Sequence, residues 1–176
     1  MSRALELRDA FDRGFALAER PAAPAHRDFL SLRVGGAPVA IPLGDVASLH
    51  ADLVIVPLPA RGPELLGVAA IRAAIVPIYD LGAALGVAAA AAGATRWATR
   101  WAIVLRGGAA GFAFEAHDGH ARIAEDAIAV ATGRGHVRGQ FQVDDEPRPI
   151  VDLAAVLAAI ETRWRPTGTT GPAKEP

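Results

Sequence analysis

The chain repeats part of its own sequence at a fixed separation of 72 residues. In an ungapped comparison of nineteen pairs of positions, seven pairs are identical. They are Gly67 and Gly139, Pro77 and Pro149, Ile78 and Ile150, Asp80 and Asp152, Leu81 and Leu153, Ala83 and Ala155, and Leu85 and Leu157. A repeat at one offset indicates a structural unit that is used twice. Two copies are too few for a solenoid, so we expect two similar lobes packed against each other.

The composition narrows the class of protein before any motif is considered. The 176 residues suit one domain, or two small lobes that share a core, and 52% of them are hydrophobic. There is no cysteine, which excludes disulfides and thiolate chemistry. A net charge of −1 with a single lysine argues against nucleic acid as a partner. Neither an apolar run long enough for a membrane span nor a signal-peptide pattern is found, so we expect a cytoplasmic protein.

The two ends of the chain are expected to differ from its body. Within residues 1–28, apolar positions at spacings of three and four over 3–20 predict an amphipathic helix, which Pro21 ends before a linker begins. This helix either packs on the body or binds a partner. Residues 166–176 are rich in Thr, Gly and Pro, and this composition predicts a disordered tail.

Short apolar segments separated by turn residues predict an all-β body. Residues 29–34 alternate between apolar and polar types, and Gly35-Gly36 follows them. A double glycine is a hairpin signal, because glycine accepts the positive φ that such turns need. We expect residues 39–49 to form the return strand, with Pro42 at an edge or a bulge.

A second hairpin is expected later in each copy. The apolar stretch 67–79 predicts two strands on either side of a turn near Ala73-Ala74, and its counterpart in the second copy predicts a turn at 144–146. The two copies span about 29–86 and about 101–160. We expect two small barrels, each closed by its own copy, because closure leaves no strand edge open.

Asp80 and Asp152 occupy matching positions in the two copies. Each follows a β-rich apolar segment and precedes a short pattern rich in Leu and Ala. An aspartate there can accept a hydrogen bond from a free N–H group of the first helical turn, so we expect a capping role and not catalysis. The second pattern continues through Ile160 and predicts a C-terminal helix.

Sequence motifs for catalysis and metal binding are lacking. None of the three serines lies in a Gly-x-Ser-x-Gly elbow, and there is no Gly-x-Gly-x-x-Gly or Walker pattern. His117 and His120 have a spacing that could hold a metal on a helix, but Asp118-Gly119 between them predicts a turn. We therefore expect no enzyme activity, no cofactor and no metal site.

Arg72 is unusual because it interrupts the most apolar stretch of the chain. A buried charge without a partner is costly in free energy. The side chain must therefore either form an internal ion pair or reach the surface where a partner binds. The residues alone leave both alternatives open.

The ordered motifs resemble those of the CheW-like family, the adaptor proteins of bacterial chemosensory arrays. The family pattern is an apolar strand and turn, an Ala-Ile/Leu-Pro strand leading to a valine, a proline-rich loop, a Gly-x-x-Asn-Leu-Arg-Gly segment and a Pro-x-x-Asp-Leu segment. The resemblance covers residues 29 to about 160. The matching segments are Phe29 to Gly36, Ala40-Ile41-Pro42 with Val46, Val56-Pro57-Leu58-Pro59, Gly67 to Ala73 and Val76 to Leu81.

The resemblance implies two SH3-like, five-stranded β-barrels around a common hydrophobic core, without catalytic activity. It also implies an adaptor that couples the cytoplasmic tip of a chemoreceptor to the regulatory domain of a CheA-type histidine kinase. That regulatory domain is itself a relative of the adaptor. Such proteins are cytoplasmic and are recruited to membrane receptor arrays, and the groove between their barrels takes the receptor's helical hairpin.

The same resemblance implies a partner-binding site. Carried over by motif, its expected residues are Arg72, Val46, Ile71 and Gly67. The motif's Asn and final Gly are replaced by Ala70 and Ala73. An alanine at the turn restricts positive φ, which glycine adopts freely.

An alternative function belongs to a different class. A small β-barrel protein could bind a small molecule between its lobes and have no kinase partner. Such a ligand would stabilise the native state, so a thermal shift against metabolites separates this alternative from an adaptor.

Overall fold

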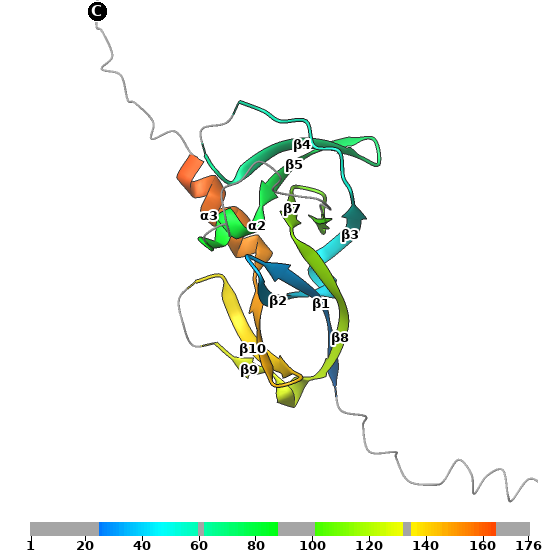
Figure 1. The fold of residues 1–176 in the computed structure, drawn as a ribbon, viewed down its shortest axis with the longest axis vertical. Helices are drawn as coiled ribbons and strands as arrows, with labels where there is room; N and C mark the ends of the chain where they lie inside the picture. The colour runs from blue at the N-terminus through cyan, green and yellow to red at the C-terminus, as the bar shows by residue number, and fades with distance from the viewer. Residues whose placement is uncertain (1–24, 60–61, 88–100, 132–134, 165–176) are drawn as a thin grey trace, which may run out of the picture.

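The computed structural model describes residues 25–59, 62–87, 101–131 and 135–164. They form a mostly β body with two sheets and few helices (Figure 1). The predicted N-terminal helix and C-terminal tail lie outside the described residues. Within the described part, no helix is both long enough and apolar enough to cross a membrane.

The strands are divided between a six-stranded sheet, here sheet A, and a five-stranded sheet, here sheet B. The spatial order in sheet A is β8 (Ala116–Ala124), β1 (His26–Val34), β2 (Ala37–Pro42), β11 (Glu146–Val151), β10 (Val137–Val143) and β9 (Ala129–Val130). The order in sheet B is β3 (Val46–Ala51), β6 (Trp101–Leu105), β7 (Gly111–Phe114), β5 (Ala74–Asp80) and β4 (Leu65–Ile71). The helices are η1 (Leu43–Asp45), α2 (Leu81–Leu85), η2 (Glu125–Ala127) and α3 (Leu153–Trp164).

Each sheet contains strands from both sequence copies. In sheet A, the β1–β2 hairpin of the first copy lies between β8 and β11 of the second copy. In sheet B, the β6–β7 hairpin of the second copy lies between β3 and β5 of the first. The expectation that each copy closes its own barrel is therefore wrong. The copies exchange their first hairpins. In both sheets the exchanged hairpin pairs with one antiparallel strand and one parallel strand of the other copy.

The offset of 72 residues is preserved in the strand register. Gly67 pairs with Ile78 in the β4–β5 hairpin, and Gly139 pairs with Ile150 in the β10–β11 hairpin. An irregularity in register precedes each glycine. The repeat in sequence is thus a repeat of one bulged hairpin.

The two hairpins also share an uncommon turn. Arg72 and Ala73 have φ values of 47° and 65°, and Asp144 and Asp145 have φ values of 51° and 63°. The predicted turn near Ala73-Ala74 is thus placed one residue too late. Positive φ is expected of glycine and tolerated by aspartate, but it strains an arginine and an alanine.

In each sheet the two edges belong to neighbouring stretches of chain. The edge strands of sheet A, β8 and β9, are joined by η2. In sheet B the chain leaving the edge strand β3 reaches the other edge, where Val56 forms a bridge to Val68 of β4. In each sheet, a short stretch of chain therefore links one edge to the other. Whether each sheet is an SH3-like barrel stays a prediction.

Three clusters of buried apolar side chains fill the body. The largest lies between the sheets and includes Leu32 of sheet A and Phe112 of sheet B, together with Leu153 and Ile160 of α3. A second cluster belongs to sheet B, and a third, which includes Phe29, belongs to sheet A. A sheet that is apolar on both faces needs cover on both sides, which the partner sheet and the helices supply here.

The predicted helix caps are confirmed. Asp80 accepts a hydrogen bond from the N–H of Ala83 at 3.1 Å, and Asp152 accepts one from the N–H of Ala155 at 3.0 Å. The C-terminal helix is confirmed as α3. Both aspartates therefore supply a partner to N–H groups that a helix leaves free at its start.

Two other local predictions are wrong. The return strand expected over 39–49 stops at Pro42, and after η1 the chain continues as β3 in the other sheet. Residues 117–120 lie in strand β8 and not in a turn, because they join the ladder to β1: Gly119 pairs with Ser31 and His117 with Leu32, and a register irregularity between these pairs accommodates Asp118. No group of three potential metal ligands occurs among the described residues.

Candidate partner-binding surfaces

An exposed row of apolar side chains lies on the outer side of sheet B. Val54, Val56, Leu58 and Ile75 are 80%, 57%, 45% and 77% exposed, and together they form what we name the apolar strip. Val56 pairs with Val68, and Ala70 of the same strand pairs with Ile75. Cross-strand partners share a face of a sheet. The strip therefore runs across neighbouring segments on one surface.

The repeat supplies an internal comparison for this surface. The positions of the second copy that correspond to Val68, Ala70 and Ile75 are Gln140, Gln142 and Pro147. The same bulged hairpin thus forms with two glutamines and a proline at these positions, so the fold does not require valine, alanine and isoleucine there. An exposed group of apolar side chains of this kind is a candidate surface for binding another protein.

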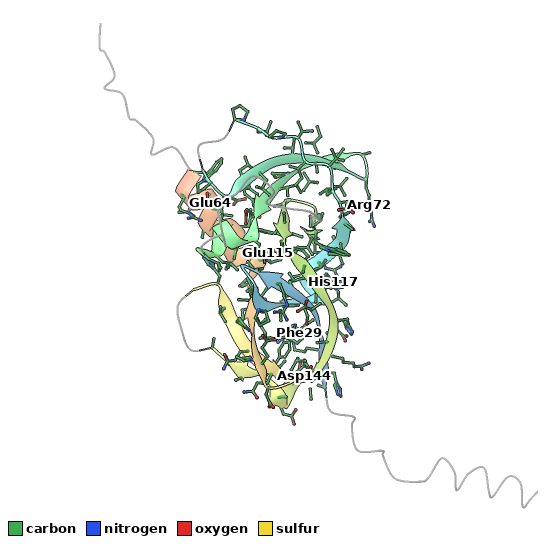
Figure 2. The ribbon with its side chains drawn as sticks, viewed as in Figure 1. Phe29, Glu64, Arg72, Glu115, His117 and Asp144 are labelled. Atoms are coloured by element: carbon green, nitrogen blue, oxygen red, sulfur yellow. The ribbon has the colours of Figure 1, made fainter. Side chains whose placement is uncertain are left out.

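Arg72 lies at the tip of the β4–β5 hairpin (Figure 2). The side chain is exposed and makes no ion pair with any residue that the structure describes. The internal ion pair considered from the sequence is therefore not found within the described residues. Among the described residues, the arginine is thus a cation without an ion pair, near Ile75 of the apolar strip.

The other predicted site residues take different positions. Ile71 is only 7% exposed and packs inside sheet B, whereas Gly67 lies at the bulge below the strip. A Cβ atom on Gly67 would lie 2.1 Å from the carbonyl oxygen of Val56. These two residues therefore shape the surface from beneath. Val46 is half-buried at the start of β3 and packs against the central cluster.

A second surface lies where the two sheets meet. A groove of ≈ 450 Å³, here the inter-sheet groove, is open to solvent beside η1. Leu43, which is one of its lining residues, is 40% exposed. The lining residues are Arg27, Asp28, Pro42, Leu43, Gly44, Asp45 and Arg106. Val46 directly follows this lining, whereas Arg72 is not part of it.

The two acidic residues of the groove contact side chains that lie outside its lining. Asp28 lies 3.0 Å from Nε2 of His120. Asp45 lies 3.7 Å from Nη1 of Arg138, whose Nε is 2.7 Å from Asp152. Each carboxylate of the groove thus has a partner among side chains that do not line the groove.

Asp152 contacts Arg138 and also caps the start of α3. Burial by itself raises the pKa of Asp152, but the hydrogen bonds from Arg138 and from the N–H of Ala155 outweigh burial and hold the pKa below its ordinary value. The hydrogen bond to Asp152 raises the pKa of Arg138. Both groups are therefore charged at neutral pH. The Asp152 carboxylate that caps α3 also forms an ion pair with Arg138.

Sequence reasoning selected Arg72 and Val46, and the resemblance implied a groove between the lobes, but neither the apolar strip nor the residues that line the groove were identified. A signal for the apolar strip was present, since Val54, Val56 and Leu58 alternate along the proline-studded connection. The groove had no such signal, because its lining comes from segments more than sixty positions apart, such as Arg27 and Arg106.

Comparison with known proteins gives the family of the chain. The model of the CheW-like domain matches residues 28–161, so the chain belongs to the CheW-like family. No curated protein matches the chain. The crystal structure of the scaffolding protein TtCheW from Thermoanaerobacter tengcongensis is similar, with a TM-score of 0.62 and 20% sequence identity. The match covers 73% of this chain and 89% of that one, and at this identity it shows the fold alone.

Proposed function

We propose that this protein is a non-catalytic adaptor that couples chemoreceptors to a CheA-type histidine kinase in chemosensory signalling. The observation that carries this proposal is that one body presents an exposed apolar strip and an inter-sheet groove that have no residue in common. An adaptor must hold two partners at once. Membership in the CheW-like family supports a scaffold role.

The apolar strip is the proposed contact for the regulatory domain of the kinase. A partner cannot easily add a strand beside the segment that carries it, because Pro57 and Pro59 have no N–H to donate. Docking on the face of the strip avoids this restriction. Affinity in such interfaces is concentrated in a few anchors, and arginine is often one of them.

The inter-sheet groove is the proposed contact for the receptor's helical tip. It is concave, and Leu43 offers an apolar floor to a helix lying in it. Arg72, Val46, Ile71 and Gly67 stay in the proposed partner-binding set. We place Val46 beside the groove and the other three with the strip. The proposal further includes SH3-like barrels and a cytoplasmic location beside membrane receptor arrays.

The test measures binding of the purified protein to a kinase regulatory domain and to a receptor cytoplasmic fragment from the same genome. Ile75→Glu should weaken binding of the kinase domain about ten-fold or more, because it puts a charge in an apolar contact. Binding of the receptor fragment should not change. Pro147→Glu is the matched control, since it alters the corresponding position of the second copy.

Arg72→Glu is a second variant for the same assay. It should reduce receptor-dependent control of the kinase while the circular dichroism spectrum stays that of the wild type, since Arg72 is exposed and unpaired within the described residues. An unfolded Arg72→Glu protein would make Arg72 structural. Unchanged kinase binding by Ile75→Glu would refute the role of the strip.

The small-molecule alternative gains no support from the packing. The space between the sheets is filled by the largest apolar cluster, which includes Phe112, Phe114 and Leu32. A thermal shift of several degrees with a metabolite would still revive it.

A further inference from the structure

We propose that the last turn of α3 positions the apolar strip through two contacts, which we name the α3 clasp. In the clasp Arg163 forms an ion pair with the buried Glu64, and Trp164 packs against Gly62. The strip is the proposed contact for the kinase domain, so the inference rests on the proposed function. The strip binds that domain tightly only while the clasp is closed.

Glu64 is an acidic residue inside the protein, beside the end of α3 (Figure 2). It is only 4% exposed, and its Oε1 atom lies 2.9 Å from Nη1 of Arg163. The arginine side chain is about half exposed, so its charge reaches inward from the surface. A buried carboxylate that loses its partner is costly in free energy. The ion pair therefore ties the end of α3 to the segment that leads into β4.

Gly62 makes room for the second contact of the clasp. A Cβ atom there would lie 2.4 Å from Cζ2 of Trp164 and 2.8 Å from Oε2 of Glu64. The φ angle of Gly62 is outside the left-handed region that favours glycine, so no turn requires a glycine at this position. The glycine instead lets an indole ring and a carboxylate approach the same point of the backbone.

The strip is attached on both sides of Leu58. On one side, Val56 and Val68 exchange two backbone hydrogen bonds of 2.8 and 2.9 Å. On the other side, the next contacts within the described residues are those of Gly62 and Glu64 with α3. If the clasp opens, Leu58 is attached on one side only. Its position on the sheet then becomes less defined, and the neighbouring backbone hydrogen bonds open more often.

The second sequence copy shows that the hairpin does not need this ion pair. His136 is the residue that corresponds to Glu64 at the offset of 72. The carbonyl of each accepts the N–H of a helix-capping aspartate, Asp80 or Asp152, at 2.7 Å. Of these two positions, only Glu64 has an ion pair within the described part of the chain. A buried ion pair adds little net stability, so its presence in the copy that carries the strip favours a positioning role.

The experiment measures hydrogen exchange of the full-length protein for Arg163→Gln, Glu64→Gln and the double variant. Arg163→Gln leaves the Glu64 carboxylate buried without its partner, so exchange of the Val56 and Val68 amides should rise about ten-fold. The double variant removes both charges, so these amides should exchange more slowly than in Arg163→Gln. The amides of β1 and β2 are the internal reference and should not change.

Binding to the kinase regulatory domain is the functional part of the experiment. Arg163→Gln should weaken it about five-fold, and the double variant should recover part of the loss. Binding of the receptor fragment should not change, because no clasp residue lines the inter-sheet groove. Arg122→Gln is the matched control, since it removes the same cation at an exposed position of β8.

Gly62→Ala opens the clasp in a different way. Its Cβ displaces the indole ring of Trp164 but removes no charge. This variant should raise exchange of the Val56 and Val68 amides and weaken kinase binding, as Arg163→Gln does. Thermal melting shows whether each variant is folded.

The outcomes separate this inference from the proposed function. Unchanged exchange at Val56 and Val68 in Arg163→Gln and Gly62→Ala would overturn the inference. So would an equal rise in β1 and β2, or a double variant that exchanges as fast as Arg163→Gln. Kinase binding that no variant changes keeps the proposed function and loses the inference. A wild-type protein that shows the expected exchange but binds no kinase domain loses the proposed function and keeps the clasp.

Discussion

Replacing Gly67 with alanine should detach the segment that carries the apolar strip from β4. The glycine has φ of 146°, and a Cβ there would lie 2.1 Å from the carbonyl oxygen and 2.7 Å from the carbonyl carbon of Val56. Real Cβ atoms essentially never approach backbone so closely. The backbone of Val56 must therefore move away from Val68.

The expected loss of stability has two parts. Moving Val56 breaks the hydrogen bonds from its N–H to the Val68 carbonyl at 2.8 Å, and from the Val68 N–H to its own carbonyl at 2.9 Å. Each is worth about 1 kcal/mol net. Positive φ costs an alanine about 1 kcal/mol more. The free energy of unfolding should therefore fall by about 3 kcal/mol.

Gly36→Ala is the matched control. Gly36 has φ of 78°, but nothing lies within 4 Å of a Cβ at this position. This variant has the conformational cost without the collision, so it should lose only about 1 kcal/mol. Urea unfolding followed by tryptophan fluorescence measures both variants, and hydrogen exchange reports the amides of Val56 and Val68.

Two results would refute this reasoning. One is a loss for Gly67→Ala no larger than that for Gly36→Ala. The other is full protection of the Val56 and Val68 amides in Gly67→Ala. If the reasoning holds, the same variant should also bind the kinase domain less tightly, because the strip no longer lies against the sheet.

Two further predictions concern the hairpin turn and the ion pair at α3. Ala73→Gly should raise the free energy of unfolding by about 1 kcal/mol, since Ala73 has φ of 65°; an unchanged thermal midpoint would contradict the strain. Asp152→Asn keeps an acceptor for the N–H of Ala155 but removes the charge that faces Arg138. The pKa of Asp152 is lowered by folding, so its ionised form stabilises the protein above the unfolded pKa, and this contribution is lost as the pH falls through the folded pKa. The variant should be less stable by about 0.5–1 kcal/mol at pH 7, and urea unfolding should show the difference shrinking below about pH 4; a difference that does not depend on pH would exclude the ion pair as its cause.

Local features of the fold were predictable because they depend on neighbouring residues. Asp80 and Asp152 cap helices because a short acceptor before a helical pattern reaches the free N–H groups. The double glycine of Gly35-Gly36 turns the first hairpin for a similarly local reason, its φ values being 61° and 78°. These constraints act within a few residues, so the sequence shows them directly.

The functional surfaces were harder to predict. Arg72 was recognisable as an outlier, yet its exposure at a strained turn came only with the structure. Leu43 was expected inside a return strand, and its place in η1 instead makes it part of the lining of a groove. Exposure and concavity depend on which segments approach from elsewhere, which a pattern along the chain does not encode.

By itself the sequence determined that one β unit occurs twice, where its hairpins turn to within a residue, and which aspartates begin the helices. Only the tertiary structure decided which copy each first hairpin joins, and so where the groove and the strip lie. The physical reason is that two similar copies present equivalent strand edges, so a hairpin finds the same backbone hydrogen bonds in its own copy or in the other. Burial of the central cluster, to which both sheets contribute, is a property of the whole chain and not of either copy.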